Sequence, residues 1–228
     1  MSSVSVIIAA AGSASRMNGI PKQLYKLCGK PVIAYSLEVF QKMEQISEII
    51  ISARSEHMDM IKDIVSEYNI TKVKAVAEGG ETRQQSVVNA LKYVSRETGL
   101  IAVHDAARPL VKEKYIAQCI RDAEIFGGAA LGVPVKDTIK EVEGGLVTDT
   151  PDRHRLFITQ TPQIFKKQKY FEGVNFAAEN GLDFTDDCQL AEAVGEKICM
   201  TPSDYFNIKL TTPEDIAVAE ALINIISE

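Results

Sequence analysis

The chain has 228 residues, enough for one large α/β unit with a full hydrophobic core. Its composition, with 46% hydrophobic and 25% charged residues, is that of an ordinary globular protein and excludes collagen-like, low-complexity and strongly disordered classes. Lys plus Arg number 25 and Asp plus Glu number 31, so the net charge is −6. This overall field opposes nucleic-acid binding, and a site for any polyanion must be locally basic.

The N-terminal segment predicts a strand at residues 4–10 and no signal peptide, because no basic group precedes its apolar run. No apolar stretch has the length of a membrane-spanning helix, so we expect no membrane partner. The three histidines lack close metal-ligand spacing, which argues against a zinc site. Four widely spaced cysteines without a CxxC pair predict reduced thiols in the cytoplasm: Cys28, Cys119, Cys188 and Cys199.

Short β-branched runs alternate with amphipathic runs of helical spacing along the first 133 residues. Strands are expected at residues 4–10, 48–53, 72–77, 100–104 and 129–133. Helices are expected at residues 32–42, 56–68, 84–96 and 112–126. This alternation predicts an α/β protein with a doubly wound, mostly parallel sheet. Loops at the carboxyl ends of such strands line the ligand crevice. We therefore expect the functional side chains within residues 11–26, 79–83 and 105–109.

The pattern changes after Pro134. Residues 136–142 and 146–150 predict two short strands around Gly144-Gly145, a hairpin that does not fit a parallel crossover. We therefore expect one domain over residues 1–228, with residues 135–155 forming a β-hairpin arm that leaves the main sheet. Helices are expected again at residues 166–179, 186–194 and 213–226, the last with Thr212 as N-cap and Pro213 in its first turn.

The first loop joins small residues to two cations directly after a strand. Small side chains at Ala10, Ala11 and Gly12 let backbone N–H groups approach a polyanion, while Arg16 and Lys22 supply positive charge. The loop matches neither a Walker A motif nor the dinucleotide fingerprint. A phosphate cradle explains these residues, and so does a Gly/Ser surface loop with two solvated cations.

A second cluster, His104 to Pro109, follows an apolar strand. Asp105 is well placed there to hold Mg²⁺ between phosphates, and Arg108 to hold a second phosphate. An ion pair between Asp105 and Arg108 that fixes the loop explains the same residues. We expect His104 to be a hydrogen-bonded structural residue.

Two further groups are ambiguous in isolation. Gly80, Arg83 and Ser86 belong to a Gly79-Gly80 segment that can admit a base and bind it by backbone amides, although a turn and a helix N-cap are the simpler explanation. Lys209 is expected in a short strand before the last helix, where a surface lysine is the default. The pair Asp186-Asp187 is better explained as the acidic first turn of a helix than as a metal site.

Together these segments resemble one family over nearly the whole chain, the 2-C-methyl-D-erythritol 4-phosphate cytidylyltransferases of non-mevalonate isoprenoid synthesis. The matching motifs are Ala10-Ala11-Gly12…Arg16-Met17…Pro21-Lys22-Gln23, Gly79-Gly80…Arg83…Ser86-Val87, Val103-His104-Asp105-Ala106-Ala107-Arg108-Pro109, Pro134-Val135-Lys136-Asp137-Thr138, Thr161-Pro162-Gln163 and Asn207-Ile208-Lys209-Leu210-Thr211. Two departures stand out: Ala14 replaces a usual Gly, and Cys188-Gln189 replaces a common Ala-Ser. The first of these can tighten the phosphate loop.

The resemblance implies a Rossmann-like nucleotidyltransferase that makes CDP-methylerythritol and pyrophosphate from CTP and the sugar phosphate, with Mg²⁺ as cofactor. It also implies a homodimer in which the arm completes the partner's site, through Thr138 and Arg153. The implied catalytic residues are Arg16, Lys22, Arg153 and Lys209. The implied nucleotide-binding residues are Ala10, Ala11, Gly12, Gly80, Arg83 and Ser86. The implied substrate-binding residues are Asp105, Arg108, Thr138, Arg153, Thr161 and Lys209, with Asp105 also on the metal.

The chemistry needs no general base, because a phosphomonoester with a second pKa near 6 is already a dianionic nucleophile at neutral pH. The absence of a catalytic His or Cys is then expected. Two alternatives stay open. One is the same reaction on another polyol phosphate such as ribitol 5-phosphate, and the other is a nucleotide-binding regulatory module without turnover.

Overall fold

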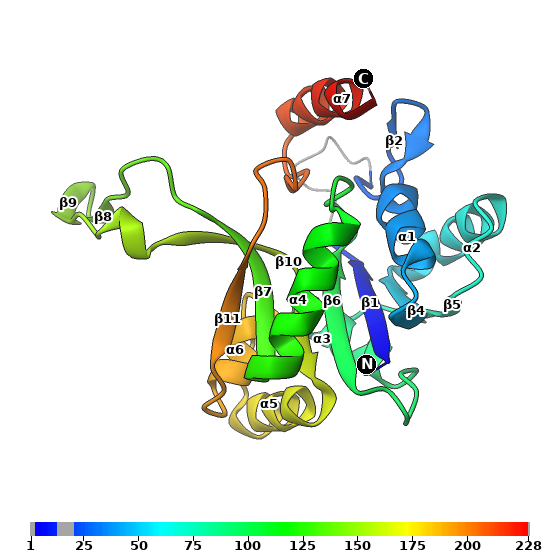
Figure 1. Cartoon of the computed structure of the whole chain (residues 1–228), viewed down its shortest axis with the longest axis horizontal. Coiled ribbons are helices and arrows are strands. Elements are labelled where there is room, and N and C mark those ends of the chain that lie inside the picture. Colours follow the sequence, from blue (N-terminus) through cyan, green and yellow to red (C-terminus); the bar gives the residue numbers. More distant parts are fainter. Residues whose placement is uncertain (1–2, 13–20, 228) are drawn as a thin grey trace.

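The structure, a computed structural model, describes residues 3–12 and 21–227. The described residues form a seven-stranded sheet in the order β11-β7-β10-β6-β1-β4-β5 (Figure 1). Neighbouring strands are parallel except that β10 runs antiparallel to both β6 and β7. The bounds are β1 Val4–Ala10, β4 Ile46–Ala53, β5 Val73–Glu78, β6 Leu100–Asp105, β7 Gly128–Pro134, β10 Phe157–Lys166 and β11 Ile198–Pro202.

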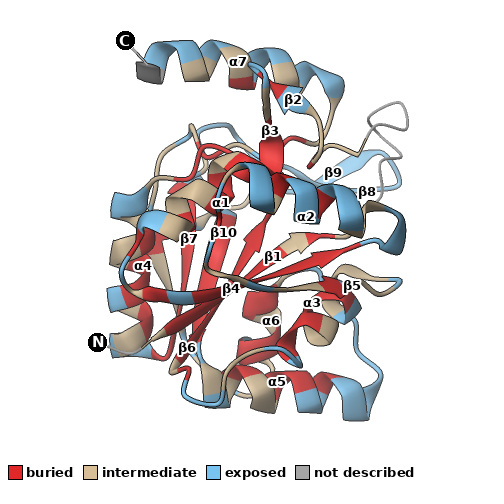
Figure 2. Cartoon of the chain, turned by 90° about the vertical axis from the view of Figure 1, so that its right-hand side faces the viewer, coloured by how far each residue is buried: buried red, intermediate tan, exposed pale blue. Residues whose placement is uncertain are grey.

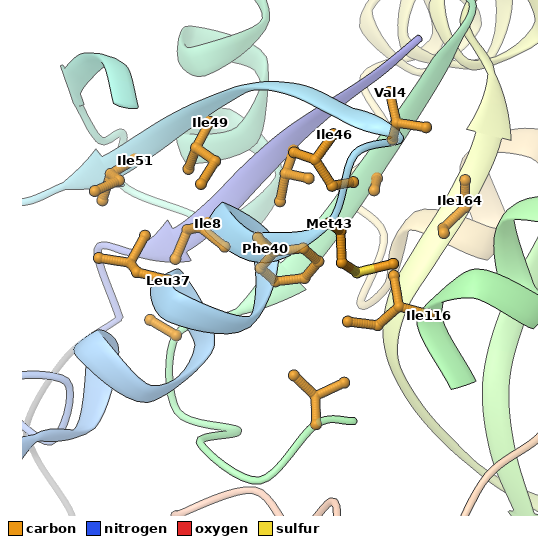
Figure 3. Packing of buried hydrophobic residues seen from close by; sticks show 14 of the residues in the cluster. Val4, Ile8, Leu37, Phe40, Met43, Ile46, Ile49, Ile51, Ile116 and Ile164 are labelled. Atoms are coloured by element: carbon orange, nitrogen blue, oxygen red, sulfur yellow. The ribbon is translucent and has the colours of Figure 1, made fainter. Parts of the chain in front are cut away.

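Helices cover both faces of the sheet, which confirms the doubly wound α/β class (Figure 2). One face packs against α1 (Val32–Lys42), α2 (Met58–Glu67) and α4 (Glu113–Phe126). The other packs against α3 (Arg83–Leu91), α5 (Lys167–Asn180) and α6 (Asp187–Glu192). Side chains alternate between the two cores along each strand, so that Ile8 joins the first core and Ile7 the second. Figure 3 shows Ile8 packed near Leu37 and Phe40 of α1 in the first core.

The predicted strands of the first 133 residues are present, but two further strands of the main sheet, β10 and β11, were not predicted. β10 lies between β6 and β7, at the middle of the sheet. Its register shifts between Thr159 and Gln163, around Pro162. A polar run interrupted by proline carries no period-2 apolar signal, and proline disfavours a central strand, so local pattern could not find it. β11 is a short edge strand beside β7.

Helix boundaries differ modestly from the sequence-based expectation. The predicted helix at residues 84–96 ends early, because α3 stops at Leu91, and the one at residues 56–68 starts as the short 3-10 turn η1 (Ser55–His57) before α2. Helix α7 (Pro213–Ser227) begins at the predicted proline. The carboxylate of Asp215 accepts hydrogen bonds from the backbone N–H groups of Thr211 and Thr212, at 2.7 and 2.8 Å, which stabilises this start.

The C-terminal helix closes one end of the molecule. It packs with the small hairpin of β2 (Lys26–Leu27) and β3 (Lys30–Pro31), and Leu27, Leu210 and Ala219 are buried together there. Lys209 lies just before this helix and is not in a strand, contrary to expectation. The segment is held to the loop after β6 instead, through a hydrogen bond from the Leu210 N–H to the Ala107 carbonyl at 2.8 Å.

The hairpin arm projects away from the main sheet (Figure 1). Its strands, β8 (Glu141–Glu143) and β9 (Leu146–Asp149), are joined by Gly144 and Gly145, both with positive φ, as a two-residue hairpin turn requires. The first strand is shorter than predicted, since residues 136–140 have no partner strand among the described residues. The 3-10 turn η2 (Arg153–Arg155) lies at the base of the arm. Among the described residues, no helix is both long and apolar enough to cross a membrane.

Candidate active site

A cleft of about 500 Å³ opens at the carboxyl ends of β1, β4, β5 and β6. It brings together three of the segments singled out from the sequence, because parallel neighbours end at the same edge of the sheet. Among the site residues expected from the sequence, those that line it are Ala10, Ala11, Gly12, Lys22, Gly80, Arg83, Ser86, Asp105 and Lys209. Arg16 lies outside the described residues. The remaining expected residues, Arg108, Thr138, Arg153 and Thr161, lie outside the lining that the described residues form.

The two glycines after β5 lie in a tightly packed turn. The Gly79 N–H donates to the Ala53 carbonyl at 2.7 Å, and the Gly80 N–H donates to Ser86 Oγ at 3.0 Å. Both amides thus have partners within the protein, and their binding to a base stays a prediction. A Cβ at Gly79 would lie 2.5 Å from the Cβ of Ala11, so glycine lets the two loops meet. The predicted N-cap is present, since the Thr82 side chain accepts from the backbone N–H of Gln85.

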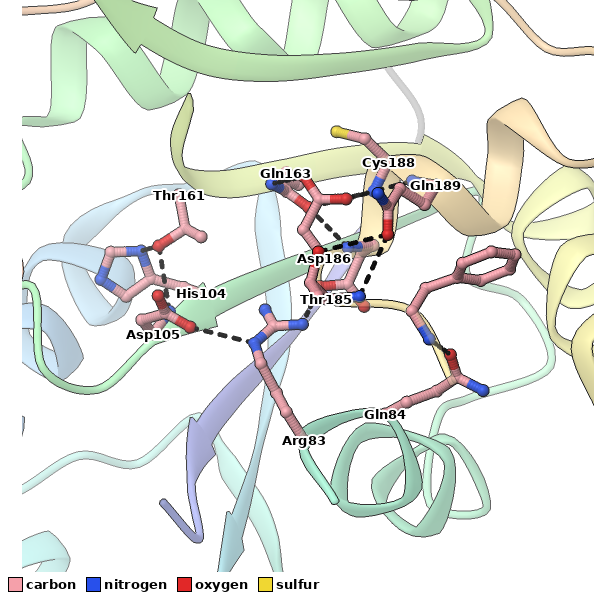
Figure 4. A network of polar contacts seen from close by, with 12 residues as sticks. Arg83, Gln84, His104, Asp105, Thr161, Gln163, Thr185, Asp186, Cys188 and Gln189 are labelled. Atoms are coloured by element: carbon pink, nitrogen blue, oxygen red, sulfur yellow. Dashed lines mark hydrogen bonds and ion pairs between the residues drawn. The ribbon is translucent and has the colours of Figure 1, made fainter. Parts of the chain in front are cut away.

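Asp105 is the centre of the charged groups in the cleft. Its Oδ1 lies 3.3 Å from Arg83 Nε (Figure 4). Its Oδ2 lies 2.7 Å from Lys209 Nζ and 3.7 Å from Arg108 Nε. Burial alone would raise the pKa of this carboxyl, but the charges of Arg83 and Lys209 outweigh it and hold the pKa well below its usual range. Asp105 is thus an anion that fixes cations at the mouth of the cleft.

Behind the cleft, Arg83 bridges two carboxylates. Its Nη1 lies 2.7 Å from Oδ2 of Asp187, whose Oδ1 accepts a hydrogen bond from the Tyr170 hydroxyl at 2.5 Å. Burial lowers the pKa of Arg83, but Asp187 and Asp105 raise it by more, and burial beside Asp187 raises that of Tyr170. Helix α6 does begin at the acidic pair, with Asp186 as its N-cap. Sequence reasoning missed that Asp187 turns inward, because an acidic helix start is ordinarily solvated.

His104 is structural, as expected. It is fully buried, and burial lowers its pKa to about 4, so the ring is neutral at physiological pH. Its Nε2 lies 3.2 Å from the Arg108 carbonyl, and its Nδ1 lies 3.0 Å from Thr161 Oγ1, which accepts from the Asp105 N–H. This arrangement assigns the ring proton to Nε2, and the Thr161 hydroxyl then donates to Nδ1. The Thr161 hydroxyl therefore supports the backbone of Asp105, whose N–H donates to it.

Arg108 is also buried, and it joins β6 to the segment that carries Lys209. Its Nη1 donates to the Asn207 carbonyl at 2.7 Å and its Nη2 to the Thr159 carbonyl at 3.4 Å. The Asn207 amide group in turn donates to the carbonyl of Thr161 at 3.0 Å. These contacts fix the backbone two residues before Lys209, and this role for Asn207 was not apparent from the sequence.

Two residues at the first loop add to the expected set. Gln23 is buried and donates to the Ala10 carbonyl at 2.9 Å, which fixes the segment that carries Lys22. Arg54, at the end of β4, donates to the Ala11 carbonyl at 3.3 Å and lines the cleft. Because the carboxyl ends of parallel strands line the crevice, the position of Arg54 after a predicted strand is the signal in the sequence that indicates it.

The arm residues stand apart from the cleft of their own subunit. Thr138 and Arg153 are exposed, and Arg153 Nη1 donates to the Lys136 carbonyl at 3.1 Å. The described residues contain no group of three or more His, Cys, Asp or Glu side chains that could hold a metal ion. Asp105 keeps carboxylate lone pairs beyond its ion pairs, so it fits a Mg²⁺ whose other ligands are phosphate oxygens and water.

Comparisons with known proteins place the chain in one family. The family model for 2-C-methyl-D-erythritol 4-phosphate cytidylyltransferase matches residues 4–225. A relative of that name from Caldanaerobacter subterraneus subsp. tengcongensis is 41% identical over 223 residues, covering 96% of this chain and 98% of the relative. Another from Clostridioides difficile is 40% identical over 222 residues, covering 96% and 93%.

Solved structures agree with the sequence matches. The crystal structure of 4-diphosphocytidyl-2C-methyl-D-erythritol synthase from Anaerococcus prevotii superposes with a TM-score of 0.87 at 31% identity, covering 98% of this chain and 96% of that one. The cytidylyltransferase of Thermus thermophilus gives 0.81 at 30% identity, covering 97% and 99%. The chain belongs to the 2-C-methyl-D-erythritol 4-phosphate cytidylyltransferase family, a family of nucleotidyltransferase enzymes.

Proposed function

We propose that this enzyme joins CTP and 2-C-methyl-D-erythritol 4-phosphate to give CDP-methylerythritol and pyrophosphate. The observation that carries the proposal is the Asp105–Lys209 ion pair at 2.7 Å, in the same cleft as Lys22 and the small residues that end β1. Lysine side chains beside small residues, which let backbone N–H groups approach a ligand closely, suit a triphosphate. This local positive charge would offset the net charge of −6 of the chain, which repels a polyanion.

The reaction would be an in-line displacement at the α-phosphorus of CTP. The substrate phosphate, a dianion at neutral pH, forms the new P–O bond, and the bond from the α-phosphorus to the bridging oxygen breaks to release pyrophosphate. Negative charge rises on the α-phosphate oxygens and on the leaving group. Lys22 and Lys209 line the cleft and would stabilise that charge, together with Arg16 if it acts as the family resemblance implies.

Each remaining group has a supporting place in this proposal. The space beside Gly80 and Ser86 would take the cytosine, with the loop of Ala10, Ala11 and Gly12 around the phosphates. Mg²⁺, held by Asp105 and phosphate oxygens, would offset charge on the triphosphate. Arg83, which lines the cleft, and Arg108, which does not, would act through Asp105, since both contact it.

The arm supports a homodimer in which Thr138 and Arg153 serve the partner's site. Its apolar side chains are exposed in the single chain, with Val142 at 58% and Leu146 at 76% exposure. An isolated two-stranded hairpin is marginal in water, so a second copy of the chain is the natural cover for it. The Thr161 hydroxyl would contribute indirectly, through the Asp105 backbone.

A reducing compartment such as the cytoplasm suits the four cysteines. All of them lie within the described residues and are free thiols there. Burial raises the pKa of both Cys119 and Cys188 well above the usual value, which makes these thiols unreactive.

The test is pyrophosphate release by the purified enzyme with CTP and Mg²⁺ against two substrates, 2-C-methyl-D-erythritol 4-phosphate and ribitol 5-phosphate. We expect turnover with the first, far slower turnover with the second, and loss of turnover on chelation of the metal. ATP and GTP should be poor donors, as membership of a cytidylyltransferase family implies. Comparable rates with ATP would contradict the cytidylyl assignment. A preference for ribitol 5-phosphate would indicate the same reaction on another polyol phosphate. Nucleotide binding without turnover would indicate a regulatory module.

A further inference from the structure

Asp187 is a buried carboxylate directly behind the active-site cleft. Its side chain is 1% exposed, and its two oxygens contact Arg83 Nη1 at 2.7 Å and the Tyr170 hydroxyl at 2.5 Å. Its backbone N–H donates to Gln163 Oε1 at 2.9 Å. Contacts from α3, α5 and β10 therefore fix it. Its partner on α3 is Arg83, the guanidinium that also contacts Asp105.

Arg83 transmits this position to the cleft. A guanidinium is planar and rigid, so anchoring Nη1 on Asp187 also fixes the edge that presents Nε to Oδ1 of Asp105, 3.3 Å away. The other oxygen of Asp105 holds Lys209 at 2.7 Å. The four side chains thus form a line of alternating charge that begins in the core at Asp187 and ends in the cleft at Lys209.

We propose that Asp187 is a positioning residue for the reaction: its carboxylate holds Arg83 so that Asp105 keeps Lys209 in place. The inference rests on the proposed function. Without the charge on Asp187, Arg83 keeps Asp105 as its remaining anion, because a largely buried guanidinium requires a partner. Arg83 then competes with Lys209 for the same carboxylate.

The predicted consequence falls on turnover rather than on nucleotide affinity. Lys209 would act on charge that develops in the transition state, so a misplaced ammonium lowers kcat. The first loop and the space beside Gly80 keep their own internal hydrogen bonds, which do not involve Asp187, so the KM for CTP is preserved.

The experiment compares Asp187→Asn with Asp186→Asn. The first substitution keeps the shape of the side chain and an oxygen for the Tyr170 hydroxyl, and it removes the charge. Asp186 is the matched control one residue earlier. Its carboxylate accepts from the Gln189 N–H as an N-cap and from Gln163 Nε2 at 3.1 Å. An asparagine caps equally well and leaves the hydrogen bond from the Asp187 N–H to Gln163 Oε1 in place. For Asp187→Asn we expect kcat to fall about tenfold or more with the KM for CTP within about threefold, and for Asp186→Asn we expect both to be unchanged.

A double variant separates positioning from general support of the fold. If Asp187 acts through Arg83, then the double variant Arg83→Leu/Asp187→Leu has the same kcat as Arg83→Leu alone. Because the double variant replaces both buried charges, neither charge is left unpaired in the core. A wild-type kcat in folded Asp187→Asn overturns the inference, as does a further tenfold loss in the double variant. If Asp187→Asn does not fold, the comparison of the double variant with Arg83→Leu decides alone, and a further tenfold loss of kcat overturns the inference.

These outcomes are distinct from failure of the proposed function. Wild-type enzyme that releases no pyrophosphate from CTP and the sugar phosphate refutes that function, whereas active wild-type enzyme with equally active Asp187→Asn refutes the positioning role alone.

Discussion

Lys209 Nζ lies 2.7 Å from Oδ2 of Asp105, although the two residues are far apart in the chain. The contact is supported from both sides. Arg108 holds the Asn207 carbonyl at 2.7 Å, and the Leu210 N–H donates to the Ala107 carbonyl at 2.8 Å. The C-terminal segment is thereby fastened to the loop after β6, which places its lysine in the cleft.

Lys209→Ala should lower turnover about a hundredfold, the usual loss when one preorganised charge-stabilising group is removed. The fold should survive, because the side chain is 39% exposed. The matched control is Lys62→Ala, which breaks a Lys–Asp ion pair of 2.8 Å on α2, away from the cleft, and should leave kcat unchanged. Pyrophosphate release at saturating substrates measures both. Near-normal turnover in folded Lys209→Ala would return this lysine to an ordinary surface role.

Gly79→Ala should weaken CTP binding and destabilise the protein. The new Cβ would lie 2.5 Å from Ala11 Cβ, and the Gly79 backbone cannot move away without loss of its hydrogen bond to the Ala53 carbonyl. We expect a KM for CTP raised about tenfold and a loss of about 1–3 kcal/mol in unfolding free energy, as for other overpacked sites. Gly12→Ala is the control for stability, since its Cβ would meet nothing within 4 Å among the described residues. Equal melting temperatures for the two variants would contradict the close approach.

The unfolding free energy should fall as the pH decreases from 7 to 5, because of His104. Burial lowers the pKa of this ring from 6.5 to about 4, so in this window the unfolded chain binds a proton that the native protein does not. Stability is retained above pH 6.5 and lost toward pH 4. The loss between pH 7 and pH 5 amounts to about 2 kcal/mol from this group.

Denaturant unfolding of His104→Gln at both pH values checks this. The variant should be less stable at pH 7, but its stability should change by about 2 kcal/mol less across the window than that of the wild type. An unchanged pH dependence would show that another group titrates there.

If Arg153 acts on the partner's site and Lys22 on its own, mixing Lys22→Ala and Arg153→Ala subunits should restore activity. A mixed dimer has one site with both defects and one intact site, whereas neither parent homodimer has an intact site. With random exchange half the dimers are mixed, so activity should recover to about a quarter of wild type. No recovery, with heterodimers demonstrated by native mass spectrometry, would show that the arm serves its own subunit or that Arg153 is not needed.

Local sequence pattern predicts the strands and helices of the first half of the chain. It also predicts the edge of the sheet at which the candidate active-site cleft lies. Runs such as Val4–Ala10 carry their own β preference, and Gly144-Gly145 supplies the positive φ values of a hairpin turn, so these elements follow from local pattern. The parallel alternation then places the loops after β1, β5 and β6 together, whatever their side chains.

Contacts between side chains far apart in the sequence depend on the tertiary structure. β10 enters the middle of the sheet although its polar run with Pro162 has no strand pattern, and it brings Gln163 to the start of α6. Asp187 turns inward to Arg83 instead of facing water, and Lys209 reaches Asp105 from a segment that is not a strand. Ion pairs of this kind depend on the packing of elements far apart in the chain. Local sequence preferences do not encode that packing, because burial and a matched partner arise only when the fold has formed.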